Sequence, residues 1–247
     1  MKKLKITMLY PREMNIYGDF GNLESLAFRA EQYGYQIEKV MYEPGDIFPL
    51  DSDIVLGGGG QDSGQGEIMA DLLAIGPQLR KMSQSGVPML MICGLYQMFG
   101  HYFLTSTDEK IEGIGLFDAY TKAGPRRMIG NIITDWEGYK LIGYENHSGL
   151  TFLSPGQRPM AKMVNGMGNN GDDGTEGAMV NNVFGSYLHG PILPKNPKFS
   201  DYLLSAAVEN KFGDKVLKPR NQEAAKMLSS IDKLAESARR IAITRPR

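Results

Sequence analysis

Residues 87–99, VPMLMICGLYQMF, contain the only cysteine of the chain and the pattern that decides the fold. A short apolar run that ends at a glycine predicts a buried strand, and the residues after Gly94 predict the first turns of a helix. A side chain at such a strand-to-helix turn is held out of the sheet, beside unpaired backbone N–H groups. Position alone leaves two interpretations of Cys93 open, a reactive thiolate and a small buried hydrophobe.

Strand-like and helix-like segments alternate through the first half of the chain. We expect strands over 1–10, 36–40, 53–56 and 87–92, and helices over 22–33 and 66–85. This order predicts an α/β fold with a mostly parallel central sheet flanked by helices. In such sheets the active site lies beyond the carboxyl ends of the strands. Cys93, the glycines 57–60 and the loop 11–21 all fall at such ends.

The second half of the chain has shorter segments and many turn residues. We expect strands over 139–145, 149–153, 161–164 and 183–188, some of them antiparallel, and a helix over 198–211. The stretch 165–174 consists of residues typical of turns and is most simply a mobile hairpin connection.

A change in composition after Gly213 divides the chain into a domain over 1–213 and a basic helical tail over 214–247. The tail has nine Lys or Arg residues against four Asp or Glu residues, and its apolar residues recur at helical spacing. Two interpretations stay open for this tail. It is a terminal helix packed on its own domain, or a docking helix for a partner or an acidic surface.

Composition limits the classes of function. A formal net charge of −1 gives no reason to expect binding of nucleic acid. One cysteine excludes an internal disulfide and a cysteine-rich zinc site, so we expect no metal and a reducing compartment. No stretch approaches the roughly 20 apolar residues of a membrane span, and the N-terminus lacks a signal sequence. These features predict a cytoplasmic protein.

A cysteine nucleophile needs a base, and the chain has three histidines. His101 is expected in the helix after the cysteine, and His147 at a turn. His189 follows an apolar strand and precedes Gly190 and Pro191, so it is placed at a strand's carboxyl end. A thiol and an imidazole distant in sequence are usual in cysteine hydrolases, and we favour His189 over His147.

Acyl transfer also needs donors for the developing oxyanion. The N–H of Leu95 is one candidate, and the glycines 57–60 supply others because bare backbone can approach a substrate closely. These glycines lack the lysine and the hydroxyl residue of a P-loop and the spacing of a dinucleotide fingerprint. We therefore expect no nucleotide or other cofactor in this chain, and any ATP-dependent activation must come from another chain.

Six segments together resemble the class I (triad) glutamine amidotransferases, and within them the cobyric acid synthase-like (CobB/CobQ) group. Each glycine motif is weak by itself, but six in the same order are a strong signal. They lie between Tyr17 and about Asn210 and are as follows: Tyr17–Asn22, Gly58–Asp62, Cys93–Gln97, Arg127–Gly130, Gly143–His147 and Gly185–Gly190.

The resemblance implies roles for single residues. Cys93 attacks the side-chain amide of glutamine, and His189 moves the proton to the leaving ammonia. Arg127 matches the family arginine that binds substrate, and a guanidinium can hold the α-carboxylate of glutamine with two hydrogen bonds. The resemblance adds Gly59, Gly60 and Gln97 as further substrate-binding residues, and Gly59 with Leu95 as oxyanion donors.

One position departs from most triad amidotransferases. They have a glutamate two residues after the histidine, where this chain has Pro191. Members of the cobyric acid synthase-like group generally lack that glutamate, so the resemblance stands. Three candidates remain for the group that orients His189: Asp19, Glu145 or an acidic residue of a partner.

The resemblance also implies a partner. Within the group, the motifs are most similar to those of glutaminases that pass ammonia to a Mur ligase-like (MurT-like) subunit, which uses ATP and Mg²⁺ in peptidoglycan synthesis. We expect a heterodimer in which the partner amidates the α-carboxyl of D-glutamate in the lipid II stem peptide to D-isoglutamine. Two alternatives stay open: a stand-alone cysteine hydrolase of γ-glutamyl compounds, and a catalytically silent binding module.

Overall fold

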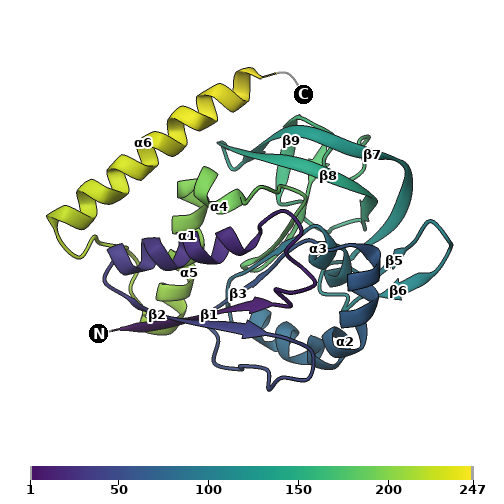
Figure 1. Cartoon of the computed structure of the whole chain (residues 1–247), viewed down its shortest axis with the longest axis horizontal. Coiled ribbons are helices and arrows are strands. Elements are labelled where there is room, and N and C mark those ends of the chain that lie inside the picture. The colour runs from purple at the N-terminus through teal and green to yellow at the C-terminus, as the bar shows by residue number, and fades with distance from the viewer. Residues whose placement is uncertain (1, 246–247) are drawn as a thin grey trace.

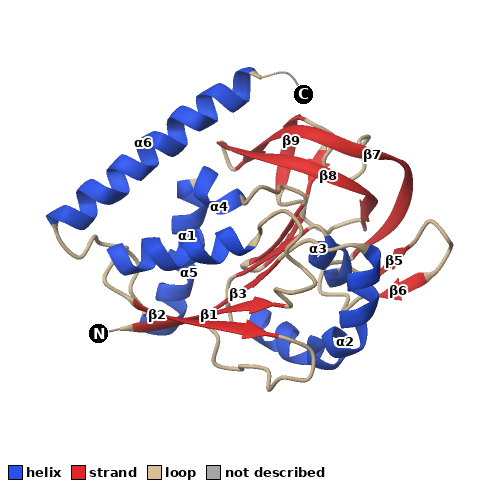
Figure 2. Cartoon of the chain, in the orientation of Figure 1, coloured by secondary structure: helices blue, strands red, loops and turns tan. Residues whose placement is uncertain are grey.

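The computed structural model describes residues 2–245, which form two β-sheets with helices around them (Figures 1 and 2). The central sheet has the strand order β11-β12-β4-β3-β1-β2, and all neighbours are parallel except β11 and β12. The expected α/β fold with a mostly parallel sheet is therefore confirmed. Its strands are β1 (Lys3–Leu9), β2 (Gln36–Tyr42), β3 (Ile54–Gly57), β4 (Met89–Ile92), β11 (Ala178–Val180) and β12 (Val183–Ser186).

The middle strands β3, β4 and β12 are buried along their whole length. Burial on both faces explains why they are continuous apolar runs rather than alternating ones. Helices lie on both sides of the sheet (Figure 1), and α1 contacts α4 and α5, while α2 contacts α3. The helices are α1 (Phe20–Gln32), α2 (Asp62–Gln84), α3 (Gly94–Phe99), α4 (Ile192–Lys195), α5 (Pro197–Phe212) and α6 (Gln222–Thr244).

The second sheet is a mainly antiparallel one, with the order β10-β9-β7-β5-β6 and with β8 paired to β7. Its long β7–β8 hairpin extends the expected strands 139–145 and 149–153 into one strand and adds a strand over 119–136 that the sequence did not predict. The strands are β5 (Tyr102–Leu104), β6 (Lys110–Glu112), β7 (Ala119–Trp136), β8 (Tyr139–Leu153), β9 (Ala161–Asn165) and β10 (Thr175–Glu176).

Two local predictions, both on histidines, are wrong. His101 lies outside the helix, because α3 ends at Phe99, and its exposed ring contacts the Asp118 carboxylate at 2.8 Å. His147 lies within β8 and is buried, not at a turn. The segment 165–174 connects the antiparallel strands β9 and β10, as predicted for a hairpin connection. It is anchored at the buried Asn169, which accepts a hydrogen bond from the Tyr96 hydroxyl and donates to the Gly177 carbonyl.

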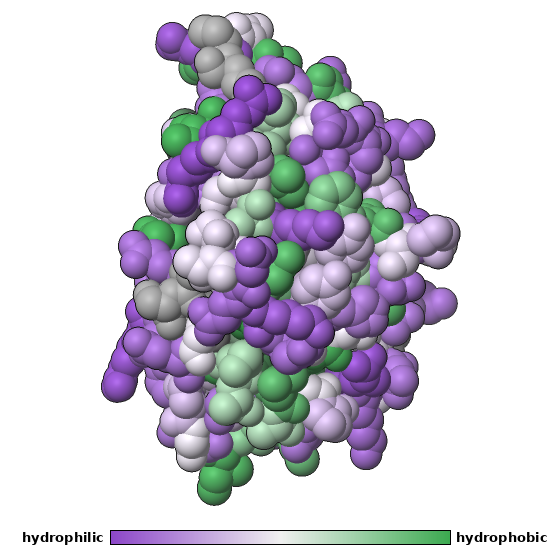
Figure 3. Space-filling model, turned by 90° about the vertical axis from the view of Figure 1, so that its right-hand side faces the viewer, coloured by the Kyte–Doolittle hydropathy of each residue, from purple (hydrophilic) through white to green (hydrophobic). Residues whose placement is uncertain are grey.

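The C-terminal helix α6 begins where Asn221 accepts a hydrogen bond from the Ala224 N–H, a standard N-cap. Residues 246 and 247 of the predicted tail lie outside the described residues. None of the helices that residues 2–245 form is both long and apolar enough to cross a membrane. On the side of the molecule drawn in Figure 3, hydrophilic side chains cover most of the surface and hydrophobic ones form smaller separate areas.

Candidate active site

Cys93 stands between β4 and α3 in a strained backbone conformation, with φ 51° and ψ −103°. A non-glycine residue in such a region costs about 1–3 kcal/mol, and residues of this kind cluster at functional sites. The Cys93 N–H donates to the Ser186 carbonyl at 2.8 Å, which fixes the turn to the end of β12. The sulfur-bearing side chain is 8% exposed and borders a pocket, so the cysteine is not sealed in apolar packing.

His189 follows β12, the strand that neighbours β4, and is therefore delivered to the same edge of the sheet as Cys93. Its backbone forms two hydrogen bonds with Tyr144 of β8, which hold it in place. The Gly59 position shows how closely the two side chains converge. A Cβ atom there would lie 2.8 Å from the His189 Cε1 and 3.1 Å from the Cys93 Cβ. Glycine at this position is what lets the thiol and the imidazole meet.

Asp19, immediately before α1, is completely buried and lies beside His189. Its Oδ2 is 3.6 Å from the His189 Nδ1 and accepts a hydrogen bond from the Gly59 N–H at 2.8 Å. A buried carboxylate needs compensating charge, and here it has an imidazole, a backbone donor and the N-terminal end of a helix.

The charge state of His189 follows from these neighbours. Burial by itself lowers the pKa of His189, but the attraction of Cys93 and the contact with Asp19 outweigh it and raise that pKa to about 10. The arrangement therefore favours an imidazolium beside the Cys93 side chain. The dipole of α3 contributes little to the electrostatics at Cys93, since this helix has only six residues.

Both N–H groups that the sequence suggested as oxyanion donors are engaged within the protein. The Leu95 N–H donates to the Gly58 carbonyl at 3.4 Å, and the Gly59 N–H donates to Asp19. The Leu95 bond is long, so a substrate oxygen can replace the Gly58 carbonyl at small cost. Rotation of the Gly58–Gly59 peptide is what this exchange requires.

A pocket of about 480 Å³ opens next to Cys93, a size suited to a small metabolite. Four of the predicted site residues line the pocket: Gly60, Cys93, Gln97 and Arg127. The other five are not lining residues: Asp19, Gly59, Leu95, Glu145 and His189. The pocket is lined by Ile16, Tyr17, Gly60, Gln61, Cys93, Gln97, Phe103, Arg127, Asn146, His147, Ser148 and Gly149.

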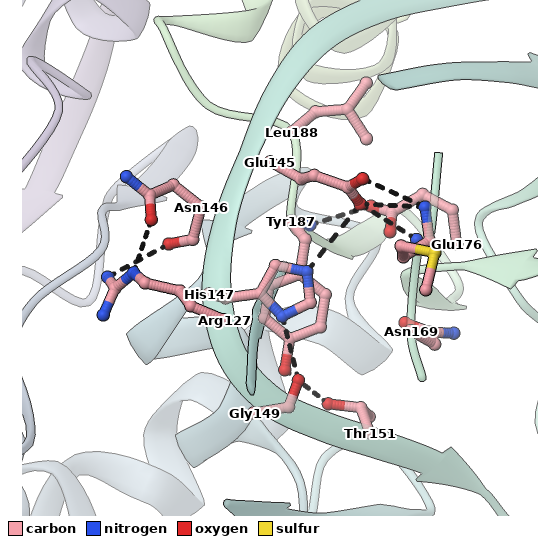
Figure 4. Close-up of polar contacts among 12 residues, drawn as sticks. Arg127, Glu145, Asn146, His147, Gly149, Thr151, Asn169, Glu176, Tyr187 and Leu188 are labelled. Atoms are coloured by element: carbon pink, nitrogen blue, oxygen red, sulfur yellow. Dashed lines mark hydrogen bonds and ion pairs between the residues drawn. The ribbon is translucent and has the colours of Figure 1, made fainter. Parts of the chain in front are cut away.

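Arg127 is the positive charge at this pocket and is held by its neighbours. Its Nε donates to the Asn146 side-chain oxygen, and its Nη2 lies 3.4 Å from the Asn146 carbonyl (Figure 4). The same Nη2 lies 3.4 Å from the Tyr17 hydroxyl. The Tyr17 ring also packs edge-on against His189, with ring centroids 4.7 Å apart. Tyr17 thus covers the imidazole and touches the arginine that borders the pocket.

A buried network of hydroxyl groups positions the Gln97 side chain. Its Nε2 donates to the Tyr187 hydroxyl at 3.1 Å, and that hydroxyl is 2.6 Å from the Thr151 hydroxyl. The His147 ring stacks on Tyr187 with centroids 3.6 Å apart (Figure 4). These contacts join α3, β8 and the segment after β12 on the buried side of the site.

Glu145 lies on the other side of His147 (Figure 4). Its carboxylate accepts hydrogen bonds from the Met167 and Gly168 N–H groups and lies 3.9 Å from the His147 Nε2. Burial lowers the pKa of His147 and keeps the ring neutral, although Glu145 opposes this. The structure thus brings Asp19 to His189, and it uses Glu145 to anchor the segment after β9.

Sequence reasoning missed several residues of the site, namely Tyr17, Asn146, Thr151 and Tyr187. Tyr17, Asn146 and Tyr187 lie inside three of the quoted motifs, so their positions were available although their roles were not. Thr151 and Tyr187 act through a hydroxyl contact between β8 and the residue after β12, a contact that no sequence pattern marks.

Comparison with known proteins identifies the family of the chain. The CobB/CobQ-like glutamine amidotransferase domain matches residues 5–197. "Lipid II isoglutaminyl synthase (glutamine-hydrolyzing) subunit GatD" of Streptococcus pneumoniae is 36% identical over 243 residues, which cover 95% of this chain and 94% of the relative. The protein of the same name from Staphylococcus aureus is 35% identical, covering 85% of this chain and 87% of its own.

Among solved structures, a glutamine amidotransferase from Thermotoga maritima superposes with a TM-score of 0.52 at 15% identity, covering 97% of this chain and 98% of that one. At this identity the likeness shows a shared fold alone. The match over residues 5–197 and the two relatives above 30% identity show more, and confirm the resemblance drawn from the six motifs. The chain belongs to the CobB/CobQ-like glutamine amidotransferase family.

Proposed function

We propose that this chain is the glutaminase subunit of a lipid II isoglutaminyl synthase, corresponding to GatD in the named relatives. It hydrolyses glutamine at Cys93 and His189 and passes the ammonia to an ATP-dependent, Mur ligase-like partner of the MurT type. That partner amidates the α-carboxyl of D-glutamate in the lipid II stem peptide. The observation that carries the proposal is the convergence of Cys93 and His189 on Gly59, at the edge of a pocket that Arg127 borders.

The reaction divides into two steps. The Cys93 thiolate attacks the amide carbon of the glutamine side chain, and the His189 imidazolium gives its proton to the nitrogen as the carbon–nitrogen bond breaks. Ammonia leaves, and a γ-glutamyl thioester remains on Cys93. His189, now neutral, takes a proton from water, and the hydroxide displaces the thiolate to release glutamate.

The surrounding residues orient the substrate and the base. Arg127 binds the α-carboxylate of glutamine, since a partly shielded guanidinium matches a carboxylate with two parallel hydrogen bonds. Gln97 and the Gly60 backbone contact the rest of the substrate. The Leu95 and Gly59 N–H groups stabilise the oxyanion once the Gly58–Gly59 peptide has turned.

Asp19 is the third member of the triad in this proposal, because its carboxylate lies 3.6 Å from the His189 Nδ1. Glu145 is less suited, since its carboxylate faces His147 and the Met167 N–H. Asp19 fixes the tautomer of His189 and stabilises the imidazolium, which is the usual task of the acid in a triad.

The test separates glutamine from ammonia as the nitrogen source. In the complex with the ligase subunit, Cys93→Ala should abolish amidation supported by glutamine and leave amidation supported by ammonium salts unchanged. Cys93→Ser serves as a second variant of nearly the same volume. Loss of both activities in a folded complex, or retention of the glutamine-dependent one, would contradict the assignment.

Two alternatives give different results in the same assay. A stand-alone hydrolase of γ-glutamyl compounds would release ammonia without forming a complex with any ATP-dependent ligase. A silent binding module would keep full complex function after Cys93→Ala.

A further inference from the structure

The C-terminal helix α6 places one charged side chain inside the body of the protein. Its buried residues are Ala224, Leu228, Ala235 and Arg239, and Arg239 is only 4% exposed. A buried guanidinium loses its hydration, so it needs partners that compensate for that loss. Compared with an apolar side chain at the same position, the guanidinium adds hydrogen bonds of defined direction.

The partners of Arg239 lie at the start of β8 and just before α5. The guanidinium carbon lies 4.1 Å from the centroid of the Tyr139 ring, and Tyr139 is the first residue of β8. The Nη1 donates to the Asn196 side-chain oxygen at 2.7 Å, and the Nε lies 3.1 Å from the Glu236 carboxylate on α6 itself. In Figure 1 the tip of the β7–β8 hairpin points toward α6, in agreement with the contacts between α6 and β8.

Asn196 is completely buried and ties β8 to α4. Its side-chain oxygen also accepts from the Ile142 N–H at 3.0 Å, and its side-chain nitrogen donates to the Ile142 and Ile192 carbonyls, both at 2.8 Å. With the bond from Arg239, the amide accepts two hydrogen bonds and donates two, which is its full capacity. Because a guanidinium only donates, Arg239 requires the oxygen of this amide to face it and the nitrogen to face the two carbonyls.

On the β8 side, the backbone that Asn196 fixes leads directly to His189. Tyr144 follows Ile142 by two residues and exchanges two backbone hydrogen bonds with His189, at 2.8 and 3.2 Å. The packing between them is tight, since a Cβ atom at Gly143 would lie 2.8 Å from the Leu188 Cβ. A shift of this part of β8 therefore moves the backbone of His189 with it.

On the α4 side, the chain reaches Asn196 shortly after it leaves His189. Ile192, whose carbonyl Asn196 binds, is the third residue after His189. The next residue, Leu193, donates its N–H to the Asn22 side chain at 2.9 Å, in the first turn of α1, which Asp19 precedes. The segments on both sides of the imidazole are therefore fixed at one buried amide.

We infer that Arg239 of α6 is a positioning residue for the glutaminase site, because it orients Asn196, which fixes the two segments that hold His189. This inference rests on the proposed function, because it takes His189 as the group that moves the proton during glutamine hydrolysis. The match to the amidotransferase domain ends at residue 197, so this contact comes from a helix outside the matched region. Misplacing a reacting group by about 1 Å costs about 10²-fold in rate, so the contact affects kcat although Arg239 does not touch substrate.

The experiment measures glutamine hydrolysis by full-length variants of this chain, with the ligase subunit at saturating concentration. Arg239→Met keeps an apolar stem of similar length and removes the charge and the donors. We expect kcat to fall about tenfold or more with a smaller change in KM, because the variant displaces a reacting group rather than a binding contact. Arg239→Lys keeps a cation and an N–H donor, and it should restore kcat to within about threefold of the native value.

Two controls separate this role from the general attachment of α6. Arg240→Met makes the same chemical change at the next position, which is exposed. Asp232→Asn removes the ion pair, 2.7 Å long, between α6 and Arg29 of α1, and it leaves the contact with Asn196 in place. Both controls should keep kcat within about twofold of the native value. Thermal unfolding shows whether each variant is folded, and Arg239→Gln replaces Arg239→Met if the latter does not fold.

The outcomes separate this inference from the proposed function. Native kcat in folded Arg239→Met, or in folded Arg239→Gln where that variant replaces it, overturns the inference alone. A loss that Asp232→Asn reproduces, or that Arg239→Lys does not reverse, also overturns it, because the hydrogen bond to Asn196 is then not what matters. Absence of glutamine hydrolysis by the native chain in the complex overturns the inference together with the proposed function.

Discussion

At the scale of single residues, Asp19 and His189 form the least conventional part of the site. Most triads of this class hold the acid two residues after the histidine, but here a carboxylate from the start of the chain approaches the imidazole at 3.6 Å. Asp19 also accepts the Gly59 N–H, so one carboxylate contacts both the base and the glycine loop. The orientation of His189 and the conformation of that loop are therefore linked through a single side chain.

Replacing Asp19 with asparagine tests that role. Asp19→Asn should lower kcat for glutamine hydrolysis by about 10²-fold or more, because the imidazolium loses its stabilising charge. The alkaline limb of the pH profile should move to lower pH, since Asp19 helps raise the pKa of His189. Steady-state kinetics between pH 6 and about 10 measure both effects.

The control for this variant is Glu145→Gln, which changes the other candidate carboxylate. It should leave the pH profile in place, because Glu145 contacts His147 and two backbone N–H groups. A native pH profile in Asp19→Asn together with a shifted pH profile in Glu145→Gln would contradict Asp19 and would make Glu145 the third member of the triad.

At the scale of elements, the junction of β10 and β12 contains a buried acid that makes stability depend on pH. Glu176 accepts hydrogen bonds from the Ser186 hydroxyl and the Tyr187 N–H, both at 2.7 Å, and is fully buried. Burial raises the pKa of Glu176 from 4.5 to about 7, although these hydrogen bonds oppose the rise. The folded state thus binds a proton that the unfolded state has already released between pH 4.5 and 7.

This difference predicts the sign of the effect. The contribution of Glu176 to the free energy of unfolding falls as pH rises through that window, by about 3 kcal/mol at most. Glu176→Gln keeps an acceptor for Ser186 and removes the titration. Urea unfolding at pH 5 and pH 8 should therefore show a smaller loss of stability in the variant than in the native chain. Parallel pH profiles of the two proteins would contradict the assignment.

Elements of the central sheet could be predicted because their sequences are locally consistent. The residues of β3 and β4 are apolar runs bounded by Gly or polar turns, and burial on both faces explains them. The strand β7 was missed because Gly124, Pro125 and two arginines interrupt it, where the pairing with β8 shifts register. Its strand conformation follows from pairing with β8, which only the folded chain provides.

The connection at 165–174 shows what composition can and cannot predict, because its turn residues do join the antiparallel strands β9 and β10. The turn residues do not show that the Asn169 side chain is buried and hydrogen-bonded on both its oxygen and its nitrogen. The composition of a segment predicts the backbone conformation that the segment can adopt. It does not predict which other side chains the segment contacts. The same limit applies to the site, where Cys93 and His189 stood out by position while Tyr187 and Thr151 did not.

At the scale of the whole molecule, the chain has one region inside the family match and one outside it. The two sheets and their helices hold the pocket, and they account for the residues matched by the amidotransferase domain. The helix α6 (Gln222–Thr244) lies outside that match and leaves Met227, Leu234 and Ile241 exposed. Under the proposed function, the glutaminase chemistry belongs to the region that holds the pocket.

The central claim is that Cys93 is a nucleophile that His189 activates in a glutamine pocket. Peptide mass spectrometry after treatment with a diazo-ketone analogue of glutamine tests it most directly. We predict one covalent adduct, on Cys93, which excess glutamine prevents and which forms more slowly in His189→Asn. An unmodified Cys93 after full exposure to the reagent, or labelling that glutamine does not reduce, would contradict the account.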